Sequence, residues 1–168
     1  MERVWRRGRW LKPFFWLVSW SDMLFPETGS DIPVTVDIRA AKKSARRQVW
    51  RREFRFPSGR RRRFTSRMEY DKRLRRVIEV IGPGGTLAVD WEMRFEVPST
   101  LHLDGAGWVI RVGPWRLRIP SWLLGSGRAI ETADLSRPGI IRIDFKVSHP
   151  LLGDVFGYGG EFLVRRKR

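Results

Sequence analysis

The chain has 168 residues, with 34 Lys and Arg against 18 Asp and Glu, which gives a formal net charge of +16. This length suits one compact domain, and a content of 42% hydrophobic and 12% aromatic residues excludes wholesale disorder. The lack of Cys excludes disulfides, thiol redox chemistry and Cys-based zinc sites, and two His are too few for a histidine-rich metal centre. We therefore expect no metal and no cofactor.

The positive charge is concentrated in one part of the chain. Residues 42–76 carry 16 basic and 3 acidic side chains, a net of +13, and 13 of the basic residues are Arg. Arg pairs bidentately with phosphate, so this block fits an anionic partner, although a merely solvated surface fits it equally well. The candidates for an anionic-surface contact are Arg60, Arg61, Arg62, Arg63, Lys72 and Arg73.

Residues 1–25 are predicted to form an aromatic and basic helix packed on or beside the domain that follows. Trp10, Phe14, Leu17 and Ser21 recur at the 3.6-residue spacing. The apolar stretch 13–18 is far shorter than the ~20 residues of a membrane span, and no signal-peptide cleavage site follows it. Trp residues beside Arg and Lys are typical both of a helix in the plane of a membrane and of one packed on a sheet.

Residues 26–168 are predicted to form a single β-rich domain. The turn cluster 26–31 is followed by segments in which apolar and polar residues alternate, most cleanly over 87–97. About nine strands follow one another, with turns at 104–105 and 153–154 and a short helical turn at 121–124. Short connections favour antiparallel pairing. We therefore predict a mainly β fold, an antiparallel curved sheet or barrel-like meander behind an N-terminal helix.

Catalytic signals are weak, and we do not expect an enzyme. Ser148 and His149, near Asp144 or Asp154, supply the residue types of a hydrolytic site, but adjacent residues on a strand point to opposite faces. The glycine-rich segment 82–85 lacks the helix start and the Lys-Ser/Thr pair that phosphate binding needs.

Nucleic-acid binding through residues 42–76 is an alternative function. Residues 50–56 alternate aromatic and Arg side chains, a composition that suits base stacking and phosphate contacts. The aromatic residues share one face, however, as core residues do, and no known RNA- or DNA-binding signature is present. We therefore rank this function second.

A series of short motifs runs through most of the chain. It comprises Phe25-Pro26-x-x-Gly29-x-x-Ile32-Pro33-Val34, Trp50-x-Arg52-x-Phe54, Phe64-x-Ser66, Ile119-Pro120-x-Trp122-Leu123, Phe145-x-Val147-x-His149-Pro150-x-x-Gly153 and Tyr158-x-Gly160-x-Phe162. The series resembles the bacterial family known only as domain of unknown function 4166. This resemblance implies a compact β-rich domain that occurs alone or attached to oxidoreductase-like domains, with no activity assigned. A separate oxidoreductase is thus an expected partner, and an accessory role in an oxidoreductase system is a third function.

Polar residues within these motifs are candidates for contacts with a ligand. Arg52 is expected to face inward and to need a partner, Glu131 or Asp144, because an unpaired buried charge costs several kcal/mol. A curved sheet with apolar side chains and a few converging polar groups is how a ligand pocket is lined. We therefore predict a non-catalytic binding domain for an apolar or amphipathic ligand, cytoplasmic and peripheral to the anionic inner face of the membrane. The ligand candidates are Arg52, Ser66, His149 and Tyr158.

Overall fold

A computed structural model describes residues 1–8, 26–41, 44–81, 84–112 and 114–163. These residues form one antiparallel sheet of 12 strands, which confirms the predicted mainly β fold. The short helical turn predicted at 121–124 is also present, as α2 (Ser121–Leu124). The strands are β1 (Arg3–Arg6), β2 (Gly29–Ser30), β3 (Val34–Ala41), β4 (Ser44–Arg55), β5 (Arg61–Asp71), β6 (Arg76–Ile81), β7 (Leu87–Glu96), β8 (Thr100–Val112), β9 (Trp115–Ile119), β10 (Ser126–Ala133), β11 (Ile140–His149) and β12 (Gly153–Leu163).

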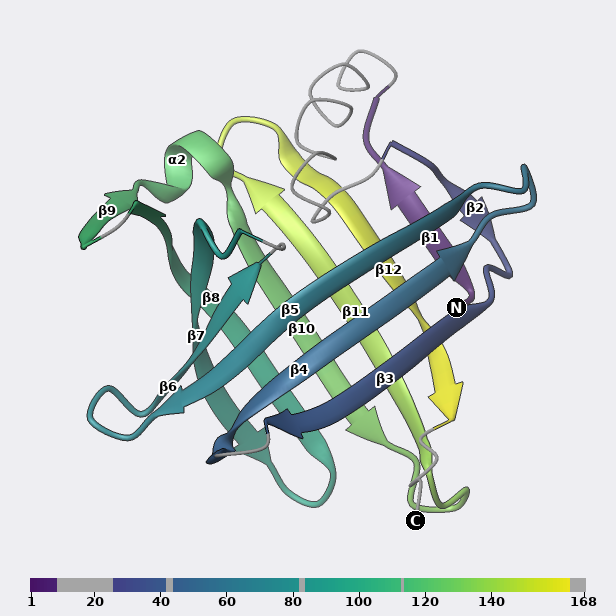
Figure 1. Cartoon of the computed structure of the whole chain (residues 1–168). Helices are drawn as coiled ribbons and strands as arrows, with labels where there is room; N and C mark the ends of the chain where they lie inside the picture. Colours follow the sequence, from purple (N-terminus) through teal and green to yellow (C-terminus); the bar gives the residue numbers. More distant parts are fainter. Residues whose placement is uncertain (9–25, 42–43, 82–83, 113, 164–168) are drawn as a thin grey trace.

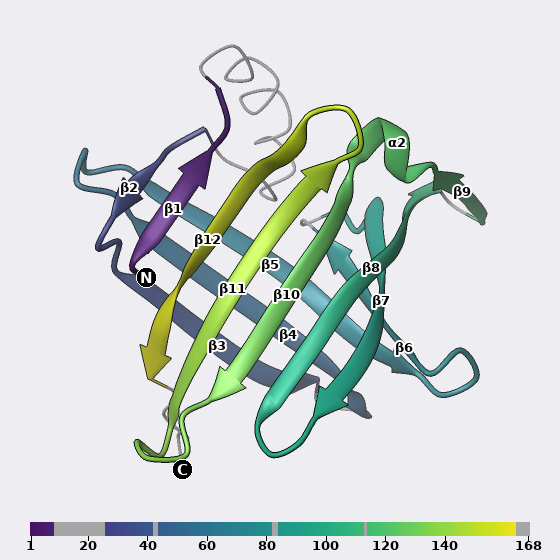
Figure 2. The same ribbon diagram turned by 180° about the vertical axis from the view of Figure 1, so that it is seen from behind.

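The sheet curves back over itself into two layers (Figures 1 and 2). Strands β3, β4 and β5 form one layer and β10, β11 and β12 the other, and the two layers cross steeply, while β7 and β8 connect them on one side. The strand order is β2-β1-β12-β11-β10-β8-β7-β6-β5-β4-β3, with β9 paired to β8 outside this path. Because β2 and β3 end the order without pairing to each other, the curved sheet is not a closed barrel.

The N-terminal helix predicted over residues 1–25 is wrong where the structure describes this segment. Residues 3–6 form β1, which pairs antiparallel with β12 and places Val4 opposite Tyr158. Val4 is buried, and the Trp5 ring packs so closely on β12 that a Cβ atom on Gly157 would lie 2.7 Å from it. Residues 9–25, which carry the helical spacing, lie outside the described residues. Pairing with a distant strand therefore determines the conformation of residues 3–6.

Two predicted turns lie in the wrong place. Asp104 and Gly105 sit inside the continuous strand β8, where a register shift opposite Asp90 and Trp91 forms a bulge. A bulge bends a strand and increases its twist without reversing it, so β8 continues past a sequence that is typical of a turn. The turn between the last two strands covers residues 150–152, and Gly153 already belongs to β12.

The core lies between the two layers as two neighbouring clusters. One cluster fills the open edge of the sheet and includes Phe54, Phe156 and Tyr158, of which Phe54 and Phe156 are each 1% exposed. The second cluster includes Trp91 and Leu103. The Phe145 ring joins the two, at centroid distances of 6.5 Å from Trp91 and 4.8 Å from Tyr158. Within the described residues, no helix is long and apolar enough to cross a bilayer.

Candidate functional site

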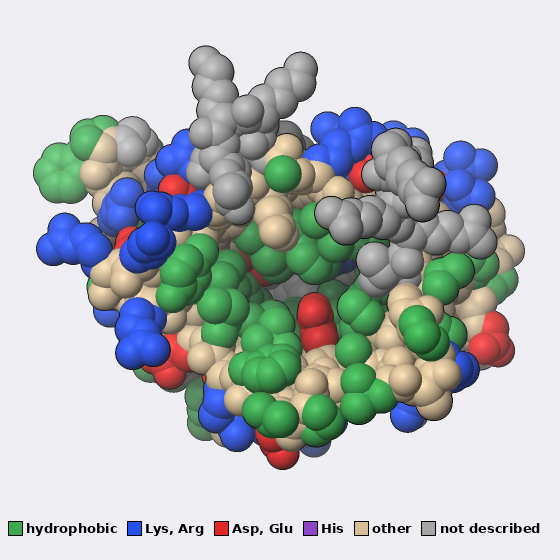
Figure 3. Space-filling model, turned by 90° about the horizontal axis from the view of Figure 1, so that it is seen from below, with side chains coloured by type: hydrophobic (Ala, Val, Ile, Leu, Met, Phe, Trp, Pro, Cys, Tyr) green, Lys and Arg blue, Asp and Glu red, His purple; other side chains and the backbone are tan. Residues whose placement is uncertain are grey.

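A cavity lies between the two layers of the sheet. Its volume is about 50 Å³, enough for a few water molecules at roughly 10–15 Å³ each. Figure 3, seen from below, shows a hollow at this end of the molecule with hydrophobic side chains around it and an acidic side chain inside it. The lining is apolar apart from Arg52, Glu79, Glu131 and the Tyr158 hydroxyl, and its apolar members include Phe54, Phe64, Ile81, Val89, Trp91, Leu103, Ala129, Ile143, Phe145 and Val147.

Arg52 and Glu79 form a buried ion pair on the wall made by β4, β5 and β6. The Arg52 Nη1 atom lies 3.7 Å from the Glu79 Oε1 atom, and the two residues are 9% and 5% exposed. Arg52 Nη1 also donates a hydrogen bond of 3.3 Å to the Ser66 hydroxyl. The Arg52 guanidinium carbon lies 4.9 Å from the ring centroids of both Trp50 and Phe64, a distance typical of cation–π contacts. The charge of Arg52 is therefore held by several neighbours.

Glu79 is held from its other side by Trp91. The indole Nε1 of Trp91 donates a 2.9 Å hydrogen bond to Glu79 Oε2, whereas the buried Oε1 atom has no hydrogen-bond partner among the described residues. Trp91 is itself positioned by close approach of the backbone, since a Cβ on Gly127 would lie 2.7 Å from the Trp91 ring. Glu79 thus has one oxygen, Oε2, held by a hydrogen bond, and one, Oε1, that has the ion pair with Arg52 but no hydrogen bond.

Glu131 and Tyr158 approach the same space from the opposite wall. Burial raises the pKa of Glu131 above 4.5; the charge of Arg52 opposes this shift and that of Glu79 adds to it. Within the part of the chain that the structure describes, the Glu131 carboxyl has no hydrogen bond or ion pair within 4 Å. Burial raises the pKa of Tyr158 to about 12, and its hydroxyl has no hydrogen-bond partner among the described residues either. Tyr158 therefore stays protonated at neutral pH.

The alternation of each strand explains why these residues point inward. Glu79 is one of three alternating residues of β6, Val77, Glu79 and Ile81, that face the core, and Glu131 lies opposite Leu101 and Ile143, which also face it. Glu79 was not among the residues predicted for the site, although a Glu at the centre of an apolar strand face is a signal for it. Of the two expected partners of Arg52, Glu131 shares its cavity.

Asp144, the other expected partner of Arg52, does not fill this role. It is exposed on the outer face of β11, where its carboxylate lies 3.6 Å from Lys146 Nζ. Asp144 is next to Phe145, which faces the core, so the alternation of β11 turns its side chain away from Arg52. Glu79 takes the partner role instead.

The structure places two of the four ligand candidates, Arg52 and Tyr158, in the lining of the cavity. Ser66 does not line it but accepts the hydrogen bond from Arg52, and His149 does not line it either. His149 Nδ1 instead accepts a 3.2 Å hydrogen bond from the Leu151 backbone N–H in the turn between β11 and β12. The neighbouring Ser148 hydroxyl donates to Asp154 at 2.6 Å. Ser148 and His149 are therefore engaged separately.

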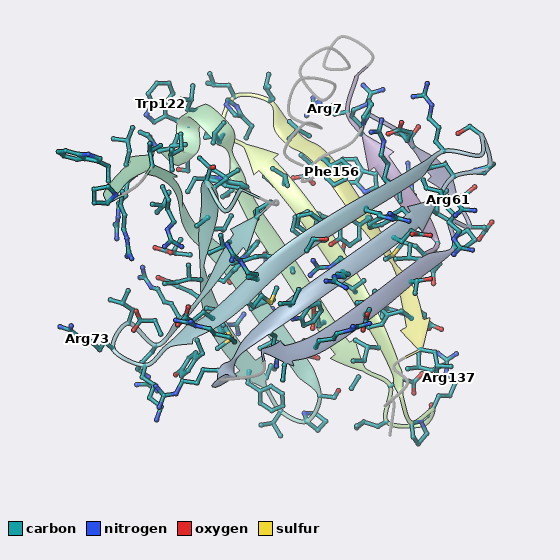
Figure 4. All side chains as sticks on the ribbon, in the orientation of Figure 1. Arg7, Arg61, Arg73, Trp122, Arg137 and Phe156 are labelled. Atoms are coloured by element: carbon teal, nitrogen blue, oxygen red, sulfur yellow. The ribbon has the colours of Figure 1, made fainter. Side chains whose placement is uncertain are left out.

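The anionic-surface candidates lie at the two ends of β5. Arg60 to Arg63 lie where the strand begins, and Lys72 and Arg73 follow its end, about 33 Å of strand away (Figure 4). Arg60 and Arg62 pair with Glu27 at 3.2 and 2.8 Å. Arg63 pairs with Glu53 at 3.0 Å. Exposed Arg61, Lys72 and Arg73 pair with no acidic side chain among the described residues.

These ion pairs also affect the acids involved. Burial raises the pKa of Glu27, but hydrogen bonds from Arg62 and Arg60 outweigh it and leave the pKa lowered. Hydrogen bonds from Arg63 and Arg55 lower the pKa of partly buried Glu53. Arg60, Arg62 and Arg63 of the basic block are thus paired locally. Two of the aromatic residues of the block, Phe54 and Phe56, are buried in the core, so their rings are not available for base stacking.

Comparisons with known proteins identify the family of this chain. Residues 1–162 match the family described as "Domain of unknown function (DUF4166)". The chain belongs to this family. It is similar to "Uncharacterized protein YndH" of Bacillus subtilis (strain 168), with 30% identity over 141 residues that cover 82% of this chain and 67% of the relative. No solved structure matches the chain.

The cavity of this DUF4166 domain is built in part from the short motifs described above. Arg52 and Phe54 come from the second motif, Phe64 from the third, Phe145 from the fifth and Tyr158 from the last. Segments far apart in the sequence therefore meet around one interior space.

Proposed function

We propose that this DUF4166 domain is a non-catalytic binding domain for an apolar or amphipathic small molecule, held in the cavity between the two layers. The observation that carries the proposal is the set of polar groups without a hydrogen-bond partner among the described residues, Glu79 Oε1, the Glu131 carboxyl and the Tyr158 hydroxyl, in an otherwise apolar interior. Leaving a buried polar group without a partner costs about 1–3 kcal/mol. A ligand that supplies the missing hydrogen bonds recovers part of that cost.

The size of the cavity indicates how such a ligand lies. Pockets for whole drug-sized molecules occupy roughly 300–1,000 Å³, whereas this cavity has about 50 Å³. It therefore takes the polar end and the first few carbons of the molecule. The inner face of β7 continues outward from there, since Phe95 pairs in register with Leu101, and Leu101 with Glu131. Phe95 is 63% exposed and Met93 40%, so this apolar face accommodates the rest of the ligand.

Native mass spectrometry of protein purified from its own host tests the proposal. We expect a non-covalent adduct that organic extraction removes. The variant Ala129→Leu fills the cavity and should lose the adduct, because Ala129 is 5% exposed and lines the space. Ala133→Leu is the matched control, since Ala133 lies on the same strand but is exposed. Wild-type protein without an adduct, or an adduct that Ala129→Leu retains fully, contradicts the proposal, provided that circular dichroism shows the variant folded.

A second proposal concerns the anionic membrane surface and rests on the projection formed by β9 and α2. Figure 1 shows these two elements standing out from one end of the sheet. Trp115 is 76% exposed and Trp122 62%, and Trp122 points away from the body of the protein (Figure 4). Exposed Arg116 and Arg118 alternate with the apolar residues of β9 and have no acidic partner among the described residues. Indole rings beside uncompensated Arg suit the interface of a bilayer with anionic headgroups.

Vesicle flotation tests this membrane contact. We expect recovery with phosphatidylcholine vesicles containing anionic phosphatidylglycerol at low salt, and little with phosphatidylcholine alone. The double variant Trp115→Ala/Trp122→Ala should lose most of the recovery. Leu74→Ala/Leu135→Ala, which removes two exposed apolar residues elsewhere, should not. Equal recovery with neutral and anionic vesicles would refute the membrane contact.

A further inference from the structure

We propose that the cavity selects molecules whose polar end donates hydrogen bonds and carries no negative charge, a hydroxyl or a protonated amine, and that Glu131 determines this specificity. The inference rests on the proposed ligand-binding function and specifies the class of ligand. It follows from which polar atoms in the cavity already have hydrogen bonds within the protein and which lack them.

The positive charge in the cavity already interacts with groups of the protein itself. Arg52 is its one basic lining residue among those described, and it faces Glu79 at 3.7 Å and Ser66 at 3.3 Å. The rings of Trp50 and Phe64 lie 4.9 Å from its guanidinium carbon. A carboxylate ligand gains little from a guanidinium that is balanced by Glu79 and enclosed by two rings.

The polar atoms of the cavity that lack a hydrogen bond are mostly acceptors. Glu79 Oε1 has no hydrogen-bond partner within the described part of the chain, and the Glu131 carboxyl offers two further oxygens. The Tyr158 hydroxyl can donate or accept, and Tyr158 is 8% exposed. A ligand hydroxyl or ammonium supplies the donors that these atoms lack. Glu79 and Tyr158 are both more than nine-tenths buried, so bulk water does not readily satisfy them.

The charge count in the cavity leads to the same conclusion. With all groups ionised, one Arg faces two Glu, so the described lining carries a net charge of −1. With Glu131 protonated, the lining is neutral and its carboxyl both donates and accepts. A ligand carboxylate would be repelled in the first case and only weakly held in the second, because like charges interact strongly where water is excluded.

The experiment compares three ligands with the same ten-carbon chain, decan-1-ol, decylamine and decanoate, below their aggregation concentrations at pH 7.4. Affinities are measured by isothermal titration calorimetry with delipidated full-length protein. We expect the alcohol and the amine to bind at least about tenfold more tightly than decanoate, a difference of about 1.4 kcal/mol. In Glu131→Gln, decanoate should gain and decylamine should lose about fivefold or more, while decanol changes less than either.

A control variant outside the cavity and a second substitution at Glu131 distinguish failure of the inference from failure of the ligand-binding function. Glu92→Gln removes a carboxylate from the outer face of the sheet, where Glu92 is paired with Arg76, and should leave all three affinities unchanged. Glu131→Ala checks that the effect follows the loss of charge. Decanoate binding as tightly as decylamine, or an unchanged ratio in both Glu131 variants, overturns the inference while the ligand-binding function stands. If none of the three ligands binds, the ligand-binding function fails, and the inference with it.

Discussion

Replacing Arg52 with Met is expected to destabilise the domain strongly. The substitution keeps an apolar stem of similar length but leaves Glu79, which is 5% exposed, without its cationic partner. Removing one member of a buried ion pair costs about 3–5 kcal/mol. For a domain of this size each kcal/mol lowers Tm by about 2–4 °C, so the expected drop is about 6–20 °C.

A double-mutant cycle separates the loss of the pair from the loss of packing. Arg52→Met/Glu79→Gln removes both charges, and the amide oxygen of the substituted side chain can still accept the Trp91 hydrogen bond. We expect the double variant to recover at least about 2 kcal/mol relative to Arg52→Met alone, a coupling within the range seen for residues in contact.

Urea unfolding at pH 7, followed by far-ultraviolet circular dichroism, measures all four free energies of unfolding. Arg39→Met is the control, because the Arg39 side chain is 63% exposed and water screens its pair with Asp37, so this substitution should change the free energy of unfolding far less than Arg52→Met. If Arg52→Met lies within about 1 kcal/mol of the wild type, Arg52 and Glu79 are solvated. If the two substitutions are additive, they are not coupled. Either result refutes the buried ion pair.

Three further changes test the cavity wall and the core. Because burial raises the pKa of Glu131 above 4.5, the folded state binds the Glu131 proton more tightly than the unfolded state does. The stability that this proton contributes is present below pH 4.5 and is lost as the pH rises through the folded pKa. In thermal unfolding, Glu131→Gln should therefore match the stability of the wild type near pH 4 and exceed it near pH 8. Phe156→Ala should cost about 3–5 kcal/mol in urea unfolding, whereas Phe95→Ala, at an exposed position, should cost less than about 1 kcal/mol. Gly127→Ala should cost about 1–3 kcal/mol by displacing Trp91, and Gly159→Ala, with its nearest non-neighbour atom 3.4 Å away, should cost less.

The alternation of apolar residues was sufficient to predict most of the sheet. The strand over 87–97 is recovered as β7, and the aromatic residues of 50–56 do face inward. The prediction failed where pairing between distant strands determines the conformation, because periodicity reports only on local sequence. Val4 and its neighbours form a strand because β12 offers a free edge, and Asp104-Gly105 continues β8 into a bulge instead of turning because β7 continues alongside.

The sequence predicted only part of the candidate site, again because periodicity reports only on local sequence. Arg52 could be recognised as an inward charge from its place between Trp50 and Phe54, but its partner depends on how β4, β5 and β6 pair. Glu79 becomes a neighbour of Arg52 only through the register that sets Met68 opposite Glu79 and Phe64 opposite Arg52. His149 lies apart from the cavity because it is the last residue of β11, where the chain turns into β12.

The buried charges of this domain also bear on why the cavity is polar. Replacing a buried ion pair by apolar side chains is often neutral or stabilising, so folding alone does not require Arg52 and Glu79. An Arg52→Met/Glu79→Gln variant that is as stable as the wild type but no longer distinguishes decylamine from decanoate would assign the pair to ligand recognition. Equal discrimination in that variant would leave Glu131 and Tyr158 as its source, since these two groups lie on the opposite wall and are untouched by the substitutions. The stability cycle and the ligand series together therefore separate the wall that supports the site from the wall that selects the ligand.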